Sequence, residues 1–336
     1  MACNKPVPVW IYNGGLHFTP NKTGDHFESE IPCGKCTQCR LDKSRERTIR
    51  CINEASMFEQ NSFLTLTFND QKMPKDKNLD YEIFKAFMKK LRWHVQKYEN
   101  KKIRYYACGE YGGEFINKDN VWFWDRSTYQ NYLPEYPRAH FHAIIFNYWP
   151  DDAEIKFSNK FNQPVYTSEK LTKIWGNGHV SIGTVTTQSC GYVARYLMKK
   201  QNSNEATDYV AKYGQPLYDL ETGEYICDHP KVVEMAYGSS QPAIGATWLE
   251  KYYNTDCFNQ GFILGPLPDC KKYGVPRYYW EWLESYHREE FIVYKNQKIN
   301  KLILNKDKIE ADNTYERQES KDFIINKQAK KLKRDL

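Results

Sequence analysis

The sequence predicts an α+β fold, in which an antiparallel β-sheet is backed by α-helices. Two observations indicate this class. Short runs in which apolar and polar residues alternate, as in 62–68 and 179–185, are typical of strands with one buried face. Between these runs, residues 81–98 repeat apolar side chains at helical spacing. Strands and helices mixed along one segment are typical of a sheet covered by helices.

The first strand and the first helix each have one apolar face. The run 62–68 stops at Asn69-Asp70, and Thr65 and Thr67 point away from the side chains expected in the core, which are Leu64, Leu66 and Phe68. In the helix 81–98 the apolar stripe consists of Ile83, Phe84, Phe87, Leu91 and Val95.

The next two strands contain a candidate metal site. In an extended strand, His140 and His142 leave the same face about 7 Å apart, and Phe141 points to the other. The two imidazoles are either half of a divalent-metal site or two partly exposed histidines of a sheet. If strand 104–110 pairs with this strand, Glu110 completes a two-histidine, one-carboxylate site suited to Mn²⁺ or Mg²⁺.

A short helix at 168–175 and a strand at 179–185 lead into a helix that begins near Ser189. On that helix Tyr192, Tyr196 and Lys199 form one polar stripe, opposite an apolar back. Two phenols with a neighbouring cation are suited to attack on a metal-polarised phosphate. The alternative is an amphipathic helix whose tyrosines pack or face solvent. The order of elements is compatible with a ferredoxin-like core.

The amino-terminal segment is turn-rich, polar and rich in cysteine. Residues 1–30 give no clear element, and a triplet with two residues between successive thiols follows, formed by Cys33, Cys36 and Cys39. With Cys3 or Cys51 as a fourth ligand, the triplet fits structural Zn²⁺, although the spacing also resembles iron–sulfur ligation. The alternative is a loop of reduced, unligated thiols.

The remaining segments give weaker signals. Residues 40–58 predict a basic helix, and the aromatic insertion after Glu110 predicts a hairpin whose Trp122 and Trp124 could stack on bases. A hairpin at 218–225 and helices through Trp248 and from Pro276 are expected. The lysine-rich tail is expected to be a solvated helix or partly disordered. We expect four parts, at 1–58, 59–203, 204–294 and 295–336.

Composition limits the class of protein. The chain of 336 residues has a net charge of +6, so any surface for a polyanion must be locally basic. Its ten cysteines without a secretion signal favour a reducing cytoplasm. We find no apolar run of membrane-spanning length, so no membrane partner is expected.

Together, these motifs resemble those of the HUH endonucleases, the rolling-circle replication initiators, and most closely those of gokushovirus-type microviruses. The residues that carry the resemblance are the His140-Phe141-His142 strand, the Tyr192, Tyr196 and Lys199 helix, Pro32 to Cys36, Phe63 to Phe68, and Cys108 to Gly112. The likeness spans roughly residues 30 to 280. It implies an antiparallel-sheet HUH core with a cysteine-rich amino-terminal segment and carboxy-terminal helical additions.

The resemblance also implies an activity. Tyr192 or Tyr196, aided by Lys199, would nick a single-stranded origin segment with a Mg²⁺ or Mn²⁺ ion held by His140, His142 and Glu110. Single-stranded DNA and origin duplex would be the partners, in the cytoplasm of a bacterial host, with a host helicase and polymerase as further expected partners. DNA contacts are expected from Arg138, Arg195, Lys200, Trp122 and Trp124. The competing interpretations are a non-catalytic nucleic-acid-binding protein with a cysteine metal knuckle and a zinc-dependent hydrolase.

Overall fold

The chain was analysed as a computed structural model that describes all residues except 1–2, 4, 13–14, 25–26, 113, 119–120, 126–136, 160–161, 196–214, 229–231, 256, 267–269, 313 and 332–336. Two compact units are present. The first comprises residues 1–47, 253–264 and 270–336, and the second comprises 48–252 and 265–269. The boundary falls within helix α1 (Thr37–Ala55), because that helix contributes residues to both units.

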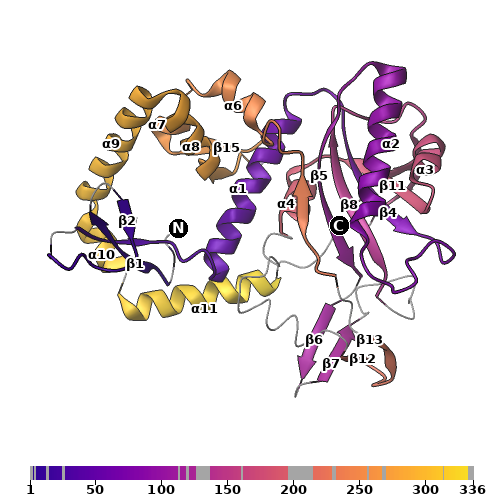
Figure 1. The fold of residues 1–336 in the computed structure, drawn as a ribbon, viewed down its shortest axis with the longest axis horizontal. Coiled ribbons are helices and arrows are strands. Elements are labelled where there is room, and N and C mark those ends of the chain that lie inside the picture. Colours follow the sequence, from indigo (N-terminus) through magenta and orange to yellow (C-terminus); the bar gives the residue numbers. More distant parts are fainter. Residues whose placement is uncertain are drawn as a thin grey trace. The chain divides into compact units, whose positions relative to one another are not determined.

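The second unit is built on a seven-stranded sheet in which every neighbouring pair is antiparallel (Figure 1). In spatial order the strands are β14 (Ala236–Gly238), β5 (Arg104–Tyr111), β8 (Ala139–Phe146), β4 (Asn61–Phe68), β11 (Gly178–Thr184), β10 (Pro164–Thr167) and β9 (Glu154–Ser158). This confirms the expected α+β class with a large antiparallel sheet. Strands β9, β10 and β14 were not expected from the sequence.

One face of the sheet is covered by α2 (Tyr81–Glu99) and α3 (Glu169–Trp175). The expected apolar stripe of α2 lies in this core, and Phe84, Phe87 and Leu91 are fully or almost fully buried there. The sheet contributes Leu64, Leu66, Phe68 and Phe141 to the same cluster, so the expected inward face of the first strand is confirmed. Ser168 caps α3 by accepting a hydrogen bond from the Leu171 N–H at 3.0 Å.

The opposite face carries the polar side chains of the central strands. Because successive side chains of a strand alternate between faces, His140 and His142 lie on the side opposite Phe141. Helix α4 (Thr187–Arg195) contacts β8 and β5 on this face, and its Tyr192 and Val193 join a second buried cluster. Different helices therefore pack against the two faces of the sheet.

A smaller sheet also belongs to the second unit. Its order is β13 (Tyr225–Asp228), β12 (Pro216–Asp219), β7 (Val121–Asp125) and β6 (Glu114–Lys118). Strands β6 and β7 form the hairpin expected in the aromatic insertion, and β12 and β13 form the one expected at 218–225. The pairing of β12 with β7 is parallel. Helix α6 (Ala246–Tyr252) follows later in the chain.

The first unit begins with a three-stranded antiparallel sheet in the order β2 (Gly15–His17), β1 (Val7–Tyr12) and β3 (Phe27–Ile31). The expectation of an amino-terminal segment without clear elements was therefore wrong, because short strands interrupted by turns give little periodic signal. The expected basic helix at 40–58 is α1, which starts three residues earlier.

The carboxy-terminal part of this unit is mostly helical. Its elements are α7 (Cys257–Gln260), β15 (Phe262–Leu264), β16 (Lys272–Gly274), α8 (Arg277–Tyr286), α9 (Arg288–Leu304), α10 (Lys306–Asp312) and α11 (Tyr315–Lys331). The Thr37 hydroxyl donates to the Asn326 amide oxygen at 2.6 Å, which ties α11 to the start of α1. Among the described residues, no helix has the length and apolar character needed to cross a membrane.

Candidate active site

The expected ligand set meets at the centre of the large sheet. Strand β8 lies between β5 and β4, and its register places His140 opposite Glu110 of β5 and His142 opposite Thr65 of β4. The Nε2 atoms of His140 and His142 lie 3.6 and 3.3 Å from the same oxygen, Oε2 of Glu110. One ligand atom from each of these three side chains lies within 4.8 Å of the others.

The outer nitrogen of each imidazole is held by a neighbour. Nδ1 of His140 donates to the Arg138 carbonyl oxygen at 3.0 Å, and Nδ1 of His142 lies 3.0 Å from the Thr65 hydroxyl. A partner at Nδ1 fixes the ring and favours the tautomer in which Nε2 carries the free lone pair. The donor set of two Nε2 atoms and one carboxylate therefore fits a divalent metal ion with open coordination positions.

The electrostatics of this cluster follow from burial and from the charges inside it. Burial alone would raise the pKa of the Glu110 carboxyl, but hydrogen bonds and attraction from His140 and His142 hold it well below its usual value. Burial lowers the pKa of His142, whereas for His140 the contacts with Glu110 outweigh burial and raise the pKa. Glu110 is therefore an anion and is able to attract a cation to this position.

Tyr192 reaches the same carboxylate from α4. Its hydroxyl donates to Oε2 of Glu110 at 2.5 Å, and its ring centroid lies 4.9 Å from that of His142. Only 6% of Tyr192 is exposed, and the Arg195 guanidinium lies 5.6 Å from its ring centroid. A phenol, two imidazoles and a carboxylate thus share one buried position. This is the arrangement that a tyrosine nucleophile beside a metal ion requires.

The start of α4 is fixed by its own side chains. The Thr186 hydroxyl accepts from the Ser189 N–H at 3.2 Å, and the Ser189 hydroxyl accepts from the Thr186 N–H at 2.8 Å. This reciprocal pair resembles a capping box, because it satisfies two backbone donors that the helix leaves unpaired. The expected caps therefore set the position of α4 one turn before Tyr192.

Several of the expected site residues lie elsewhere. Tyr196, Lys199 and Lys200 lie outside the described residues. Trp122 and Trp124 are both on β7 of the smaller sheet.

Two expected DNA contacts are engaged within the chain. The Arg138 guanidinium donates to Asp70 at 2.5 Å and to the Phe68 carbonyl at 3.0 Å. Arg195 lies beside Tyr192 at the end of the described part of α4. A role for either residue in contacting DNA stays a prediction.

A pocket of about 560 Å³ opens beside the metal-ligand cluster. The residues that line it are Thr65, Thr67, Phe68, Asn69, Asp70, Arg138, Ala139, His140 and His179. Its volume is in the range of small-molecule and cofactor sites, so a segment of a polymeric substrate could enter next to His140.

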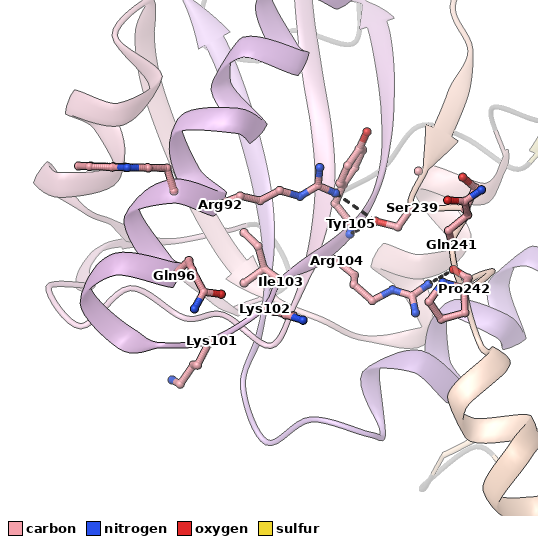
Figure 2. A pocket seen from close by; sticks show the side chains of 13 residues that line it. Arg92, Gln96, Lys101, Lys102, Ile103, Arg104, Tyr105, Ser239, Gln241 and Pro242 are labelled. Atoms are coloured by element: carbon pink, nitrogen blue, oxygen red, sulfur yellow. Dashed lines mark hydrogen bonds between the residues drawn. The ribbon is translucent and has the colours of Figure 1, made fainter.

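A second pocket, of about 840 Å³, lies at the other end of β5 and is strongly basic. Figure 2 shows Arg92 of α2 directed toward Ser239 and Arg104 of β5 directed toward Pro242; the two donor–acceptor distances are 3.5 and 2.5 Å. Lys101 and Lys102 are also among the side chains that line it. Sequence reasoning missed this pocket, although the run Lys101-Lys102-Ile103-Arg104 was a signal for it.

The structure also brings four cysteines of the first unit together. Sγ atoms of Cys3, Cys33, Cys36 and Cys39 all lie within 4.8 Å of one another. Cys51, the alternative fourth member, is fully buried in the apolar cluster of the second unit that contains Cys190. The cysteine cluster and the histidine cluster therefore belong to different units of the chain.

Thr65 and the Arg138 carbonyl were not identified as parts of the site from the sequence. Thr65 was expected only to face away from the core. A general rule could have found it: a metal-ligating histidine usually has a partner on its second ring nitrogen, and a neighbouring strand is the nearest source.

Comparisons with known proteins bear directly on this site. The model of the replication-associated protein ORF2 family matches residues 61–119 and 129–201, which include β4, β5, β8 and α4. The chain is 29% identical to the replication-associated protein VP4 of Bdellovibrio phage phiMH2K over 323 residues, covering 92% of this chain and 88% of that protein. No solved structure matches the chain.

Two further relatives have similar names. The chain is 25% identical to the replication-associated protein ORF2 of Spiroplasma virus 4, covering 94% of this chain and 92% of that protein. It is 32% identical to the replication-associated protein ORF4 of Chlamydia phage 1, covering 52% of this chain and 39% of that protein. With full-length likeness to microvirus proteins and a match across the histidine and tyrosine motifs, the chain belongs to the replication-associated protein ORF2 family.

Proposed function

We propose that this protein is a replication initiator that nicks a single-stranded origin segment by transesterification to a tyrosine, as the HUH endonucleases do. The observation that carries the proposal is the convergence of three groups on one oxygen. Both Nε2 atoms and the Tyr192 hydroxyl lie 2.5 to 3.6 Å from Oε2 of Glu110. The names of its phage relatives support the role in replication, and the endonuclease unit would correspond to residues 59–203.

His140, His142 and Glu110 would hold a divalent ion, Mg²⁺ or Mn²⁺. When bound, such an ion polarises the scissile phosphate and offsets negative charge on its oxygens. The pocket beside His140 would admit the phosphate and its flanking nucleotides. The Arg138 and Thr65 contacts hold the two rings in the orientation that binding requires.

A tyrosine of the α4 motif, Tyr192 or Tyr196, would attack the phosphorus. The phenol loses its proton, a bond forms between its oxygen and phosphorus, and the bond from phosphorus to the 3′ oxygen breaks. The 3′ oxygen takes up a proton, which leaves a 5′-phosphotyrosine and a free 3′-OH. For Tyr192, the hydrogen bond to Glu110 orients the phenol and draws its proton toward the carboxylate.

The free 3′-OH would prime synthesis, and the covalent link retains the energy of the phosphodiester bond. A second tyrosine could then cut the regenerated origin after one round, and the displaced strand could be rejoined without a nucleotide cofactor. Lys199 would stabilise charge on phosphate or phenolate. The reaction would take place in the cytoplasm of a bacterial host, with a host helicase and polymerase as partners.

The DNA would extend beyond the site over basic and aromatic surfaces. The basic pocket at the start of β5 could contact the sugar–phosphate backbone through Arg92 and Lys102, because cations of this kind give salt-dependent affinity. Trp122 and Trp124 would stack on unpaired bases, and Arg138, Arg195 and Lys200 would contact phosphates.

The test is formation of a covalent adduct. Incubation of the protein with an origin oligonucleotide and Mn²⁺ should give a protein–DNA species that survives denaturation. The His140→Ala/His142→Ala variant should give none, and neither should Tyr192→Phe/Tyr196→Phe. A matched control is Tyr225→Phe, since Tyr225 is an exposed residue of the smaller sheet.

The rival functions give different results in this assay. A zinc-dependent hydrolase that uses the same histidines would cleave the oligonucleotide and leave no covalent intermediate. A non-catalytic binding protein would retain the oligonucleotide without cleaving it. An adduct that persists in the double tyrosine variant would contradict the proposed nucleophiles.

A further inference from the structure

We propose that Cys3, Cys33, Cys36 and Cys39 bind one zinc ion, which fastens the amino-terminal sheet to the start of α1. The distances between sulfur atoms fit a single tetrahedral ion. Sγ of Cys3 lies 3.5 Å from that of Cys33 and 3.8 Å from that of Cys36. Four thiolates that each lie about 2.3 Å from a central zinc ion are separated by about 3.8 Å.

The backbone around the cluster is arranged to stabilise charged sulfur. Sγ of Cys3 accepts from the N–H groups of Lys5 and Cys33 at 3.4 and 3.3 Å. Sγ of Cys33 accepts from the N–H groups of Lys35 and Cys36 at 3.4 and 3.3 Å. A neutral thiol is a weak acceptor, whereas a thiolate accepts charge-assisted hydrogen bonds. Four N–H groups on two sulfurs therefore favour deprotonated, metal-ligating cysteines.

The four thiols come from three separate places in the chain. Cys3 precedes β1, Cys33 follows β3, and Cys36 and Cys39 are at the start of α1. The N–H of Arg40 donates to the Cys36 carbonyl at 3.1 Å, so this end of the cluster is fixed by the first turn of the helix. One ion would thus crosslink both ends of the small sheet to α1.

The sheet needs such a crosslink because it has little core of its own. Of the side chains that the structure describes between residues 3 and 31, only that of Val9 is buried. Small structures with few buried apolar groups commonly depend on disulfides or metal ions. A structural zinc ion supplies folding free energy directly, because the unfolded chain does not hold the four ligands together.

Two other fates of these thiols fit less well. The sulfur–sulfur distance of 3.5 Å between Cys3 and Cys33 is well beyond the roughly 2 Å of a disulfide bond. An iron–sulfur cluster places several iron atoms between its thiolate ligands, so the sulfurs of the ligands lie further apart than around one ion. The spacing therefore indicates a mononuclear site and favours zinc.

Metal content gives the first test. Because the histidine cluster could also bind zinc, the measurement uses the full chain carrying His140→Ala and His142→Ala, analysed by elemental mass spectrometry. We expect one zinc ion per chain, which is lost when Cys33→Ser and Cys36→Ser are added. The matched control is Cys270→Ser, a substitution of an exposed cysteine in the same unit, which should leave the zinc content unchanged.

Alkylation of the unaltered protein gives a second test that does not depend on cysteine variants folding. With iodoacetamide and peptide mapping, Cys270 should react at once, and the four cluster cysteines should react only after a strong chelator is added. Cluster cysteines that react at the rate of Cys270 in protein without bound metal would overturn the proposal. Iron in place of zinc would overturn the assignment of the ion.

Discussion

At the scale of single residues, the candidate active site depends on groups that would never touch the substrate. Thr65 is the clearest case, because its hydroxyl lies 3.0 Å from Nδ1 of His142 and its backbone pairs with that residue across β4 and β8. Outer partners of this kind set the orientation of metal-ligating imidazoles. The exact positions of β-strand neighbours thus become part of the chemistry.

We predict that Thr65→Val weakens Mn²⁺ binding by about 10- to 100-fold and lowers adduct formation at limiting metal, because His142 loses the partner that fixes its ring. Calorimetric titration with Mn²⁺ measures the affinity. Thr67→Val is the matched control: Thr67 is on the same strand, but its hydroxyl bonds to the His179 carbonyl at 3.3 Å. Equal effects of the two substitutions would show that Thr65 acts only by packing.

Tyr192 allows a second prediction at this scale. Tyr192→Phe keeps the buried ring and removes the 2.5 Å donor to Glu110, so the fold should persist while the adduct yield falls. Circular dichroism and the adduct assay measure these two properties separately. Peptide mapping of the residual adduct should then find Tyr196 as the linked residue. An undiminished yield would assign Tyr192 a purely structural role.

At the scale of elements, the pairing of β4 with β11 supports the strand beside the histidines. Gly178 pairs with Phe68, and a Cβ at this position would lie 2.3 Å from the Thr67 carbonyl oxygen and 2.5 Å from the Asn69 nitrogen. Both contacts are with backbone atoms, which cannot rotate away. Glycine is therefore required by close approach of the two strands.

Gly178→Ala should lower the free energy of unfolding by about 1–3 kcal/mol and weaken metal binding, since Thr67 also pairs with His140. Denaturant unfolding followed by circular dichroism measures the change. Gly183→Ala on the same strand is the control, because the nearest atom to its Cβ would be 3.7 Å away. A loss of stability as large in the control would contradict the argument from close approach.

The start of β5 and the facing side of α2 form the basic pocket, and its proposed contact with DNA is testable through salt. Arg92→Ala/Lys102→Ala should weaken binding of an origin oligonucleotide and reduce the slope of log affinity against log salt by about 0.7–0.9 for each phosphate that is no longer neutralised. The control is Lys85→Ala, since Lys85 of α2 pairs with Glu82 at 2.6 Å and does not line the pocket. An unchanged slope would exclude the pocket from the DNA-binding surface.

At the scale of the whole molecule, the chain separates its two candidate metal sites between its two compact units. One site consists of four thiols and suits zinc, and the other consists of two imidazoles and a carboxylate and suits a catalytic divalent ion. This division predicts that the two ions can be removed and restored independently.

Mn²⁺ should raise the melting temperature of the second unit, because a ligand that binds only the native state adds stability by mass action. At a free concentration of 100 times Kd the gain is about 2.7 kcal/mol. Differential scanning calorimetry of the full chain measures this gain, and His140→Ala/His142→Ala should abolish it. The Cys33→Ser/Cys36→Ser variant should retain the Mn²⁺-dependent shift. Loss of the shift in that variant would contradict independence of the sites.

The sequence by itself determined the class of the fold, the apolar faces of β4 and α2, and the types of residue at both metal sites, because these follow from local periodicity and side-chain chemistry. It did not determine the amino-terminal sheet, whose short strands are stabilised by pairing between segments distant in the chain. Nor could it show that Cys3, and not Cys51, joins the cysteine triplet.

Only the tertiary structure decided which side chains surround the histidines. Strand register set Thr65 and Glu110 beside them, and the packing of α4 brought the Tyr192 hydroxyl to Glu110. Register and helix packing depend on contacts between residues far apart in the chain, and the periodicity of one segment contains no information about its partner. The sequence therefore named the reactive groups, and the fold placed them at bonding distance.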